Sequence, residues 1–283
     1  MLYRMDAREC YYLFLDAPMR ARSQIVWFAL LAALPLAAQE LEPEQSALLE
    51  QTRQTALSYS NSLPDFLCTQ IVQRSQDMRG DGRWRALDKL TVKLSYSNHK
   101  EDYKLMQING KDTLQDFLRV GGSLSTGEFG TRLFAVFDPR SHAEFKWKGW
   151  GTMHKRKVAR FSYRIEQQHT SYLIQYGADS KGPNAIVVPY HGEVFVDEET
   201  HMVLRLTQTA EIPSTFPISA NDSWVEYDYA DVGGKAFLLP VHAYSKTRSG
   251  RFVAENNIDF RDYRKFQIES NITFEPATDK QPR

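Results

Sequence analysis

The chain has 283 residues, of which 42% are hydrophobic and 12% aromatic, enough to bury a substantial core. Its 35 Lys and Arg residues balance its 35 Asp and Glu residues, so the net charge gives no reason to expect nucleic acid or a strongly acidic substrate as a partner. Any electrostatic partner must be recognised by a local patch.

The first 38 residues are typical of a secretory signal peptide. Two arginines precede an unbroken apolar run at residues 25–36, and small residues follow it. A leader has a basic start, about 7–15 apolar residues and a small-residue exit, whereas a membrane-spanning helix takes about 20 apolar residues. We expect cleavage near Ala38, and Met19 begins a better leader than Met1. The protein is therefore expected to be periplasmic or secreted, without a transmembrane helix.

Two cysteines are present, and Cys10 lies in the predicted leader. The mature chain then keeps one thiol, so it has no intramolecular disulfide, and no cysteine follows the cleavage region to carry a lipid anchor. Cys68 lies in the apolar stretch "FLCTQIV", which favours a small buried side chain over a nucleophile.

Residues 42–66, "EPEQSALLEQTRQTALSYSNSLPDF", predict one amphipathic helix that ends at Pro64. Almost everything after it alternates with period two, and Asn-Gly, Gly-Gly and Ser-Gly pairs separate the runs. One buried and one wet face predict an antiparallel sheet built of hairpins. The predicted inward side chains are Leu90, Val92, Leu94 and Tyr96; Ala159, Phe161, Tyr163 and Ile165; Val225, Tyr227 and Tyr229; and Ile258 and Phe260.

The middle of the chain breaks this alternation. Residues 119–130, "RVGGSLSTGEFG", predict a loop, and the residues that follow predict a helix ending at Asp138-Pro139. Glu128 beside the helix start would repel an anion, so a lid or crossover loop is favoured over a phosphate site. The simplest organisation is a single domain over residues 39–275, with a frayed charged tail at 276–283.

Sequence signatures of catalysis are missing. The chain lacks HExxH, GxSxG, GxxxxGK[ST] and CxxC patterns. His191 and Glu193 share one strand face, as the wet face of a strand allows. We therefore predict no catalytic residue, no metal and no cofactor. A hydrolase with a site outside known motifs stays open, with Asp138, His142 or Glu144 as its candidates.

The strongest local charge feature is "FKWKGWGTMHKRKVARF", which interleaves basic residues with Trp147 and Trp150. In an exported protein, Lys155, Arg156 and Lys157 would suit an anionic membrane surface better than RNA. The alternative is the solvated basic edge of a hairpin, which also prevents sheet-to-sheet aggregation. The two tryptophans would suit the mouth of an apolar cavity.

An acidic cluster, "DEET" at residues 197–200, lies between two apolar runs. Asp and Thr side chains satisfy the N–H groups of a tight turn, and adjacent glutamates at its tip diverge into water. The cluster therefore predicts a hairpin turn rather than a metal or catalytic site.

This hairpin, "GEVFVDEETHMVLRL", has the pattern G-x-V-F-V-D-x-x-T-x-x-V-x-R. The pattern resembles that of the outer-membrane lipoprotein carrier and sorting superfamily (LolA, LolB and RseB-like proteins). "SLPDFLCTQ", "GGSLSTGEFG" and "ADVGGKAFLLPV" resemble segments of uncharacterised exported bacterial proteins. The resemblance implies an α+β fold: a strongly curved antiparallel β-sheet, an unclosed half-barrel, with an N-terminal and a mid-chain helix packed on it.

The expected function is that of a non-enzymatic periplasmic protein that binds an apolar or lipid-linked ligand in this half-barrel, in envelope maintenance or lipoprotein sorting. Its expected partners are a lipid or lipoprotein acyl chain, envelope proteins and an anionic membrane surface, with no nucleic acid. The alternative is a structural or sensor domain whose interior is filled by its own side chains. The residues expected to line the ligand site are Phe161, Tyr163, Trp147, Trp150, Tyr227 and Tyr229.

Overall fold

The structure, a computed structural model, describes residues 41–98, 100–124, 126–177 and 185–266. These residues belong to one unit of the chain, residues 39–283. The predicted leader and the predicted charged tail lie outside the described residues. No helix in the described ranges is both long and apolar enough to span a membrane.

Two α-helices are described. α1 (Pro43–Ser62) begins with a proline, and its start is stabilised by a hydrogen bond of 3.1 Å from Glu42 N to Gln45 Oε1. Proline is tolerated in the first turn because the N–H group it lacks would have no partner there. The helix ends just before Pro64, as predicted. α2 (Thr131–Phe137) is the short mid-chain helix.

The remaining chain is mostly β-structure, with three short 3-10 turns, η1 (Phe117–Arg119), η2 (Pro139–Ser141) and η3 (Gln167–His169). The strands are β1 (Phe66–Asp77), β2 (Arg85–Ser97), β3 (Lys100–Ile108), β4 (Lys111–Asp112), β5 (Glu144–Met153), β6 (Arg156–Ile165), β7 (Leu173–Gln175), β8 (Ala185–Val187), β9 (Tyr190–Asp197), β10 (Val203–Ala210), β11 (Ala220–Asp231), β12 (Ala236–Ser249) and β13 (Phe252–Lys265).

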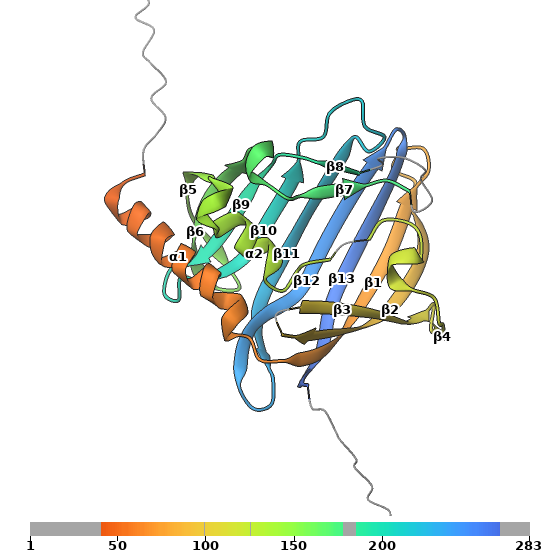
Figure 1. Ribbon diagram of the computed structural model, residues 1–283, viewed down its shortest axis with the longest axis horizontal. Helices are drawn as coiled ribbons and strands as arrows, with labels where there is room; N and C mark the ends of the chain where they lie inside the picture. The colour runs from red at the N-terminus through yellow and green to blue at the C-terminus, as the bar shows by residue number, and fades with distance from the viewer. Residues whose placement is uncertain (1–40, 99, 125, 178–184, 267–283) are drawn as a thin grey trace, which may run out of the picture. The chain divides into compact units, whose positions relative to one another are not determined.

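Eleven strands form one sheet in the order β4-β3-β2-β1-β13-β12-β11-β10-β9-β6-β5, and β7 and β8 form a separate pair. Every pairing is antiparallel. The sheet ends at β4 on one side and β5 on the other, so it is not closed (Figure 1). Two neighbouring pairs are not consecutive in the chain: β9 pairs with β6, and β13 returns to lie between β1 and β12.

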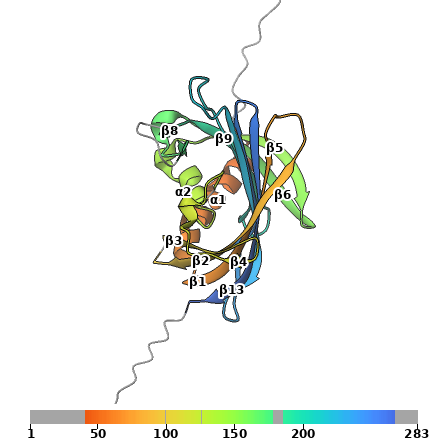
Figure 2. The ribbon, with the colours of Figure 1, turned by 90° about the vertical axis from the view of Figure 1, so that its right-hand side faces the viewer.

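Both helices lie on the same face of the large sheet, which we call the inner face. Figure 2 shows α1, α2 and β8 on one side of the strands. The Tyr59 hydroxyl of α1 donates to Leu238 O at 2.7 Å, and Arg53 Nη1 donates to Phe137 O at 3.0 Å, which ties α1 to the end of α2. The predicted fold class is confirmed: an α+β protein with an unclosed antiparallel sheet and two helices packed on it.

The predicted alternation is confirmed for most strands, since nearly all of the predicted inward side chains are buried. Tyr229 differs, with 45% of its surface exposed. The last pair between β10 and β11 is Arg205 with Glu226, while β11 continues beside β12 as far as Asp231. Tyr229 therefore has a neighbouring strand on one side only.

Candidate functional site

An apolar row crosses the inner face of the sheet. One side chain from each of ten strands stands in direct cross-strand register with the next, and the eight central ones are at most 2% exposed. Because facing side chains in antiparallel pairs lie about 5 Å apart, the row is continuous. Its members, from β3 to β5, are Ile108, Leu90, Val72, Ile258, Ala243, Val225, Leu206, Val194, Phe161 and Trp147.

A polar row lies next to it on the same face. Its five side chains are each at most 5% exposed, although buried polar groups are costly unless they are hydrogen-bonded. They also stand in cross-strand register, and two of them, Arg74 and Asn256, donate hydrogen bonds to the segment that covers them. The members, from β1 to β10, are Arg74, Asn256, Ser245, Ser223 and Gln208.

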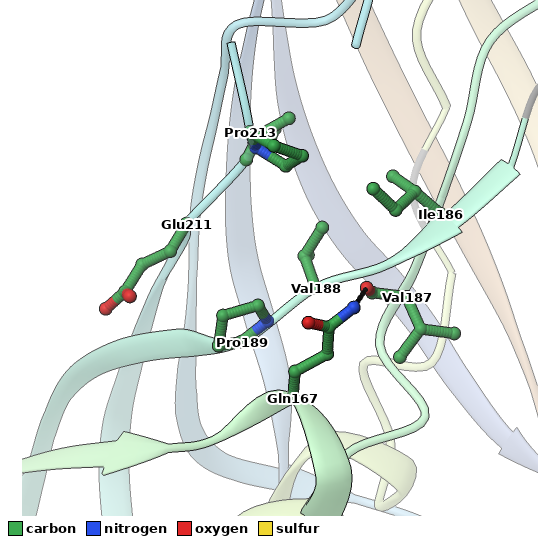
Figure 3. Close-up of a pocket in the computed structure, with 8 residues that line it drawn as sticks. Gln167, Ile186, Val187, Val188, Pro189, Glu211 and Pro213 are labelled. Carbon is green, nitrogen blue, oxygen red and sulfur yellow. Dashed lines mark hydrogen bonds between the residues drawn. The ribbon is translucent and has the colours of Figure 1, made fainter. Parts of the chain in front are cut away.

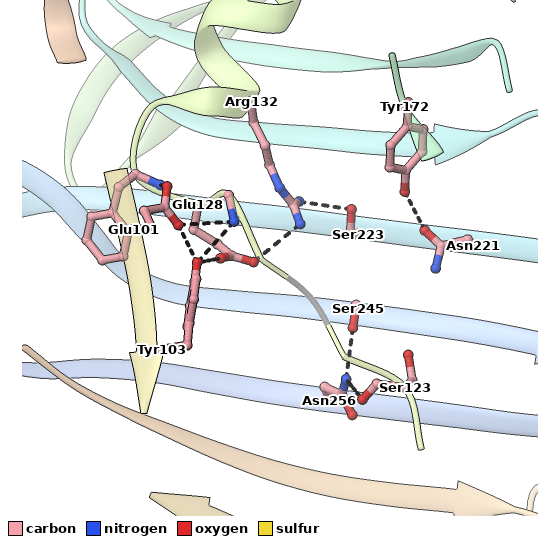
Figure 4. A network of polar contacts seen from close by, with 12 residues as sticks. Glu101, Tyr103, Ser123, Glu128, Arg132, Tyr172, Asn221, Ser223, Ser245 and Asn256 are labelled. Carbon is pink, nitrogen blue, oxygen red and sulfur yellow. Dashed lines mark hydrogen bonds and ion pairs between the residues drawn. The ribbon is translucent and has the colours of Figure 1, made fainter. Parts of the chain in front are cut away.

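The cover segment, residues 121–124 and 126–130, runs over this polar row (Figure 4). Arg74 Nη1 donates to Gly121 O, and Asn256 Nδ2 donates to Ser123 O at 2.8 Å. The Ser123 hydroxyl lies 3.1 Å from Thr247 Oγ1. These hydrogen bonds run from strand side chains to a loop rather than along a backbone ladder, so the segment rests on the inner face without extending the sheet.

Phe129, at the end of the cover segment, is completely buried among aromatic rings of the sheet. Its ring centroid lies 5.3 Å from those of Phe66 and Phe260, 6.5 Å from that of Tyr96 and 6.3 Å from that of Tyr263. Offset and edge-to-face arrangements at these distances are favourable. A loop side chain therefore occupies the most aromatic part of the inner face.

Glu101 on β3 holds the backbone of the cover segment. Its carboxylate accepts hydrogen bonds from Gly127 N at 3.1 Å and Phe129 N at 3.3 Å, and from the Tyr103 hydroxyl. Burial, and next the nearby Glu128 carboxylate, raise the pKa of Glu101 to about 7, against the opposing effect of these hydrogen bonds. Glu101 is thus a titratable contact of the cover segment near neutral pH.

Glu128 and Arg132 form a buried ion pair at the start of α2. Arg132 Nη2 lies 3.3 Å from Glu128 Oε1, and Arg132 Nη1 donates to Ser223 Oγ at 3.1 Å (Figure 4). The Tyr227 hydroxyl donates to Glu128 O at 3.0 Å. The start of α2 is therefore anchored to β11 by two strand side chains, Ser223 and Tyr227.

The aromatic residues predicted to line a ligand site fall into three environments. Phe161, Tyr163 and Tyr227 are almost completely buried on the inner face. Trp147 packs edge-on against Phe161, with ring centroids 5.1 Å apart. The remaining two, Trp150 and Tyr229, are 48% and 45% exposed.

A β-bulge in β5 brings the two tryptophans together. The register shifts between Trp147 and Gly149, whose φ of +101° suits glycine. Trp147 therefore pairs with Phe161 and Trp150 with Ala159, and the two indole rings meet at 5.3 Å. Both tryptophans lie on the inner side of an edge strand, with Trp150 at its exposed rim.

The basic residues predicted to contact an anionic surface are largely paired. Arg156 Nε lies 3.0 Å from Asp197 Oδ2, and the guanidinium lies 5.6 Å from the Tyr229 ring centroid. Lys157 Nζ lies 2.6 Å from Glu198 Oε1 and 4.1 Å from the Trp150 ring centroid. Lys155 occupies the hairpin tip with a φ of +64° and is exposed.

The acidic stretch at residues 197–200 forms the predicted turn. Asp197 Oδ1 accepts hydrogen bonds from Thr200 N and Thr200 Oγ1, both at 2.8 Å. His191 instead contacts Glu211, and Glu193 contacts Arg160, so the structure directs His191 and Glu193 to different partners. Within the described ranges, no group of three or more His, Cys, Asp or Glu side chains is placed to hold a metal ion.

Two of the three residues considered as catalytic in a hydrolase make local contacts. The Asp138 carboxylate accepts hydrogen bonds from the backbone and guanidinium of Arg140, which hold its pKa below the usual value. His142 packs against His169, with ring centroids 4.2 Å apart, and Glu144 is exposed at the start of β5. Cys68 is free and buried, as predicted.

Two surface pockets lie away from Phe129. One of about 310 Å³ opens between η3, β8 and the residues after β10, where Gln167 Nε2 donates to Val187 O at 2.9 Å (Figure 3). Another of about 350 Å³ is lined by residues of β5, β6 and β9, among them Tyr163, and by Glu211. Neither includes a member of the apolar row.

Phe129, Glu101 and the polar row were not predicted from the sequence. The polar row could have been predicted, because Asn256 lies two residues from Ile258 and therefore on the same face of its strand. An inward polar residue predicts a buried hydrogen-bond partner. Phe129 and Glu101 carried no comparable signal, because their positions depend on how a loop lies across the sheet.

No protein-family model and no curated protein matches the sequence. A LolA superfamily protein from Nitrosomonas europaea is similar in structure, with 8% identity and a TM-score of 0.37 over 81% of this chain and 97% of that one. A DUF1329 family protein from Desulfovibrio piger has 9% identity and a TM-score of 0.36 over 81% and 94%.

An outer membrane lipoprotein-sorting protein domain from Vibrio parahaemolyticus has 8% identity and a TM-score of 0.35 over 80% of this chain and 92% of that one. At these identities and TM-scores the three similarities assign neither a family nor an activity to this chain.

Proposed function

We propose that this protein is a non-enzymatic binder of an apolar chain, such as the acyl chain of a lipid or of a lipid-linked molecule, on the inner face of its sheet. The observation that carries the proposal is the apolar row, which offers one apolar side chain from each of ten successive strands. Transfer of an acyl chain from water to such a surface is worth about 0.8 kcal/mol per CH₂. No specialised polar chemistry is needed.

The ligand would replace the chain's own side chains. Phe129 covers the aromatic part of the inner face, and polar contacts from Arg74, Asn256 and Glu101 hold the cover segment. These contacts can be exchanged for water when the segment moves outward, at a net cost of about 1 kcal/mol each. An apolar ligand that takes the place of Phe129 would offset this cost.

A second candidate function is favoured by the complete burial of Phe129. An interior filled by its own side chains would suit a structural or sensor domain that acts through protein contacts. The two functions differ in one measurable property, since only the first gives saturable binding of an apolar chain to the inner face.

The test is a titration of delipidated protein with 11-(dansylamino)undecanoic acid, whose fluorescence rises in an apolar site. Val225→Thr places a hydroxyl in the apolar row at nearly unchanged volume. Val253→Thr is the matched control. Val253 is also buried, but it lies on the opposite side of β13 from Ile258, the member of the apolar row on that strand, and outside the main core.

We expect saturable binding by the wild type, about threefold to tenfold weaker binding by Val225→Thr, and unchanged binding by Val253→Thr. No saturable binding by the wild type, or equal losses in the two variants, would contradict the proposal and favour the second candidate.

A further inference from the structure

Gln70 on β1 is a fully buried amide whose side chain is unpaired within the part of the chain that the structure describes. It is 0% exposed, and neither its Nε2 nor its Oε1 has a partner among the described residues. Such an amide is rare in native proteins, because each unpaired buried polar atom destabilises the fold. Asn256, another buried amide of this face, contrasts with it, since its Nδ2 donates to both Ser123 O and Ser245 Oγ.

Gln70 lies beside the part of the inner face that Phe129 occupies. Its cross-strand neighbours are Val92 on β2 and Phe260 on β13. Phe260 is one of the rings against which Phe129 packs, at 5.3 Å. Val72, two residues further along β1, belongs to the apolar row. A chain that replaced Phe129 would therefore have the unpaired amide at one end and the apolar row alongside.

A primary amide presents one donor and one acceptor side by side. The complementary group offers an acceptor and a donor with the same spacing, as a protonated carboxyl group or another primary amide does. An ester has acceptors only and would leave Gln70 Oε1 unpaired. We propose that Gln70 recognises the neutral terminal carboxyl or carboxamide group of an acyl ligand, an inference that rests on the proposed function.

The surroundings favour a neutral group over a carboxylate. Glu101 and Glu128 anchor the cover segment near this site, and Arg132 and Arg74 are already paired with Glu128 and Asp88. An added anion would meet two carboxylates and no free guanidinium. The titratable side chains bordering this region are Cys68 and Tyr96 on the strands, Tyr103 and Glu101 on β3, Tyr263 on β13, and Glu128 in the cover segment.

The experiment uses three ligands of equal chain length, each displacing 11-(dansylamino)undecanoic acid. Dodecanamide offers a donor and an acceptor at every pH, methyl dodecanoate offers acceptors only, and dodecanoic acid offers a donor only when protonated. Each is measured at pH 5 and pH 8 with the wild type and with Gln70→Leu, in which an apolar side chain of similar length replaces the amide.

The wild type is expected to bind dodecanamide about tenfold more tightly than the ester at both pH values. Dodecanoic acid is expected to match the amide at pH 5 and to bind more weakly at pH 8. Gln70→Leu is expected to bind amide and ester equally, because leucine can neither donate to nor accept from the head group. Its melting temperature should equal or exceed that of the wild type, whereas Asn256→Leu should lower it.

Equal affinities of the wild type for amide and ester, or an amide preference that survives in Gln70→Leu, would overturn this inference and leave the proposed function standing. Failure of all three ligands to displace the probe, together with absent probe binding, would instead overturn the proposed function itself.

Discussion

At the scale of single residues, Gly192 on β9 shows how closely the inner face is packed. The Tyr163 hydroxyl reaches past this glycine and donates to Thr207 O at 2.7 Å. A Cβ added to Gly192 would collide with Thr207 O and lie 2.9 Å from the Tyr163 hydroxyl. Tyr163 therefore joins β6 to β10 across a residue that has no side chain.

Gly192→Ala is expected to destabilise the protein by about 3 kcal/mol or more, because the methyl group meets rigid backbone as well as Tyr163. The matched control is Gly151→Ala on β5, where the nearest atom is the flexible side chain of Arg160, at 3.3 Å. Urea unfolding measures both variants. Similar midpoints for the two would show that the strands around Gly192 can separate at little cost.

The period-two pattern predicted that Phe161, Tyr163 and Tyr227 face inward, and they do. It could not predict which residues lie opposite them, because register is a tertiary property. Gly192 and Gln70 depend on that register: one makes room for a side chain from β6, and the other has no hydrogen-bond partner among the described residues. The same alternation predicted that Tyr229 faces inward. It is exposed because the pairing of β11 with β10 stops at Glu226, before β11 reaches Tyr229.

At the scale of elements, the cover segment depends on one titratable strand residue. Glu101 accepts the N–H groups of Gly127 and Phe129, and its pKa is raised to about 7. Because this pKa lies above the usual value of 4.5, the folded protein binds the proton more tightly than the unfolded chain does. The resulting stability is fully present below about pH 4.5 and is lost as the pH rises through 7.

The wild type is therefore expected to lose about 2 kcal/mol of stability relative to Glu101→Gln between pH 5 and pH 8.5. Glu101→Gln keeps an acceptor oxygen but cannot ionise. The neighbouring Asp102→Asn, at an exposed position of β3, serves as the control and should keep the wild-type pH dependence. Urea unfolding across this pH range measures the free energy of unfolding of each variant. The same pH dependence for wild type and Glu101→Gln would rule out Glu101 as the titrating contact.

The basic hairpin illustrates what local sequence cannot reveal. Its charges are contiguous in the chain, yet Arg156 and Lys157 meet Asp197 and Glu198 of the neighbouring β9 and its turn. The acidic turn and the basic strand looked like separate features because their pairing is set by the sheet. The hairpin and the turn themselves were predictable from alternation and turn chemistry.

At the scale of the whole molecule, fold class could be predicted because every level of the sequence agreed: alternation, turn pairs, two helical segments and one hairpin resembling a known superfamily. The strand order could not, because β13 returns over a long separation to lie between β1 and β12. The inner face is built from that return, since Ile258, Asn256 and Phe260 all come from β13. The candidate site is therefore a product of topology more than of any motif.

The proposed binding of an apolar chain requires that Phe129 and the ligand compete for the same part of the inner face. Phe129→Ala removes the competing ring, and Phe134→Ala, an exposed residue of α2, is the control. The direct test is the dissociation constant of 11-(dansylamino)undecanoic acid for both variants and the wild type. We expect about tenfold tighter binding by Phe129→Ala and wild-type affinity for Phe134→Ala. Binding by Phe129→Ala that is no tighter than that of the wild type would contradict it.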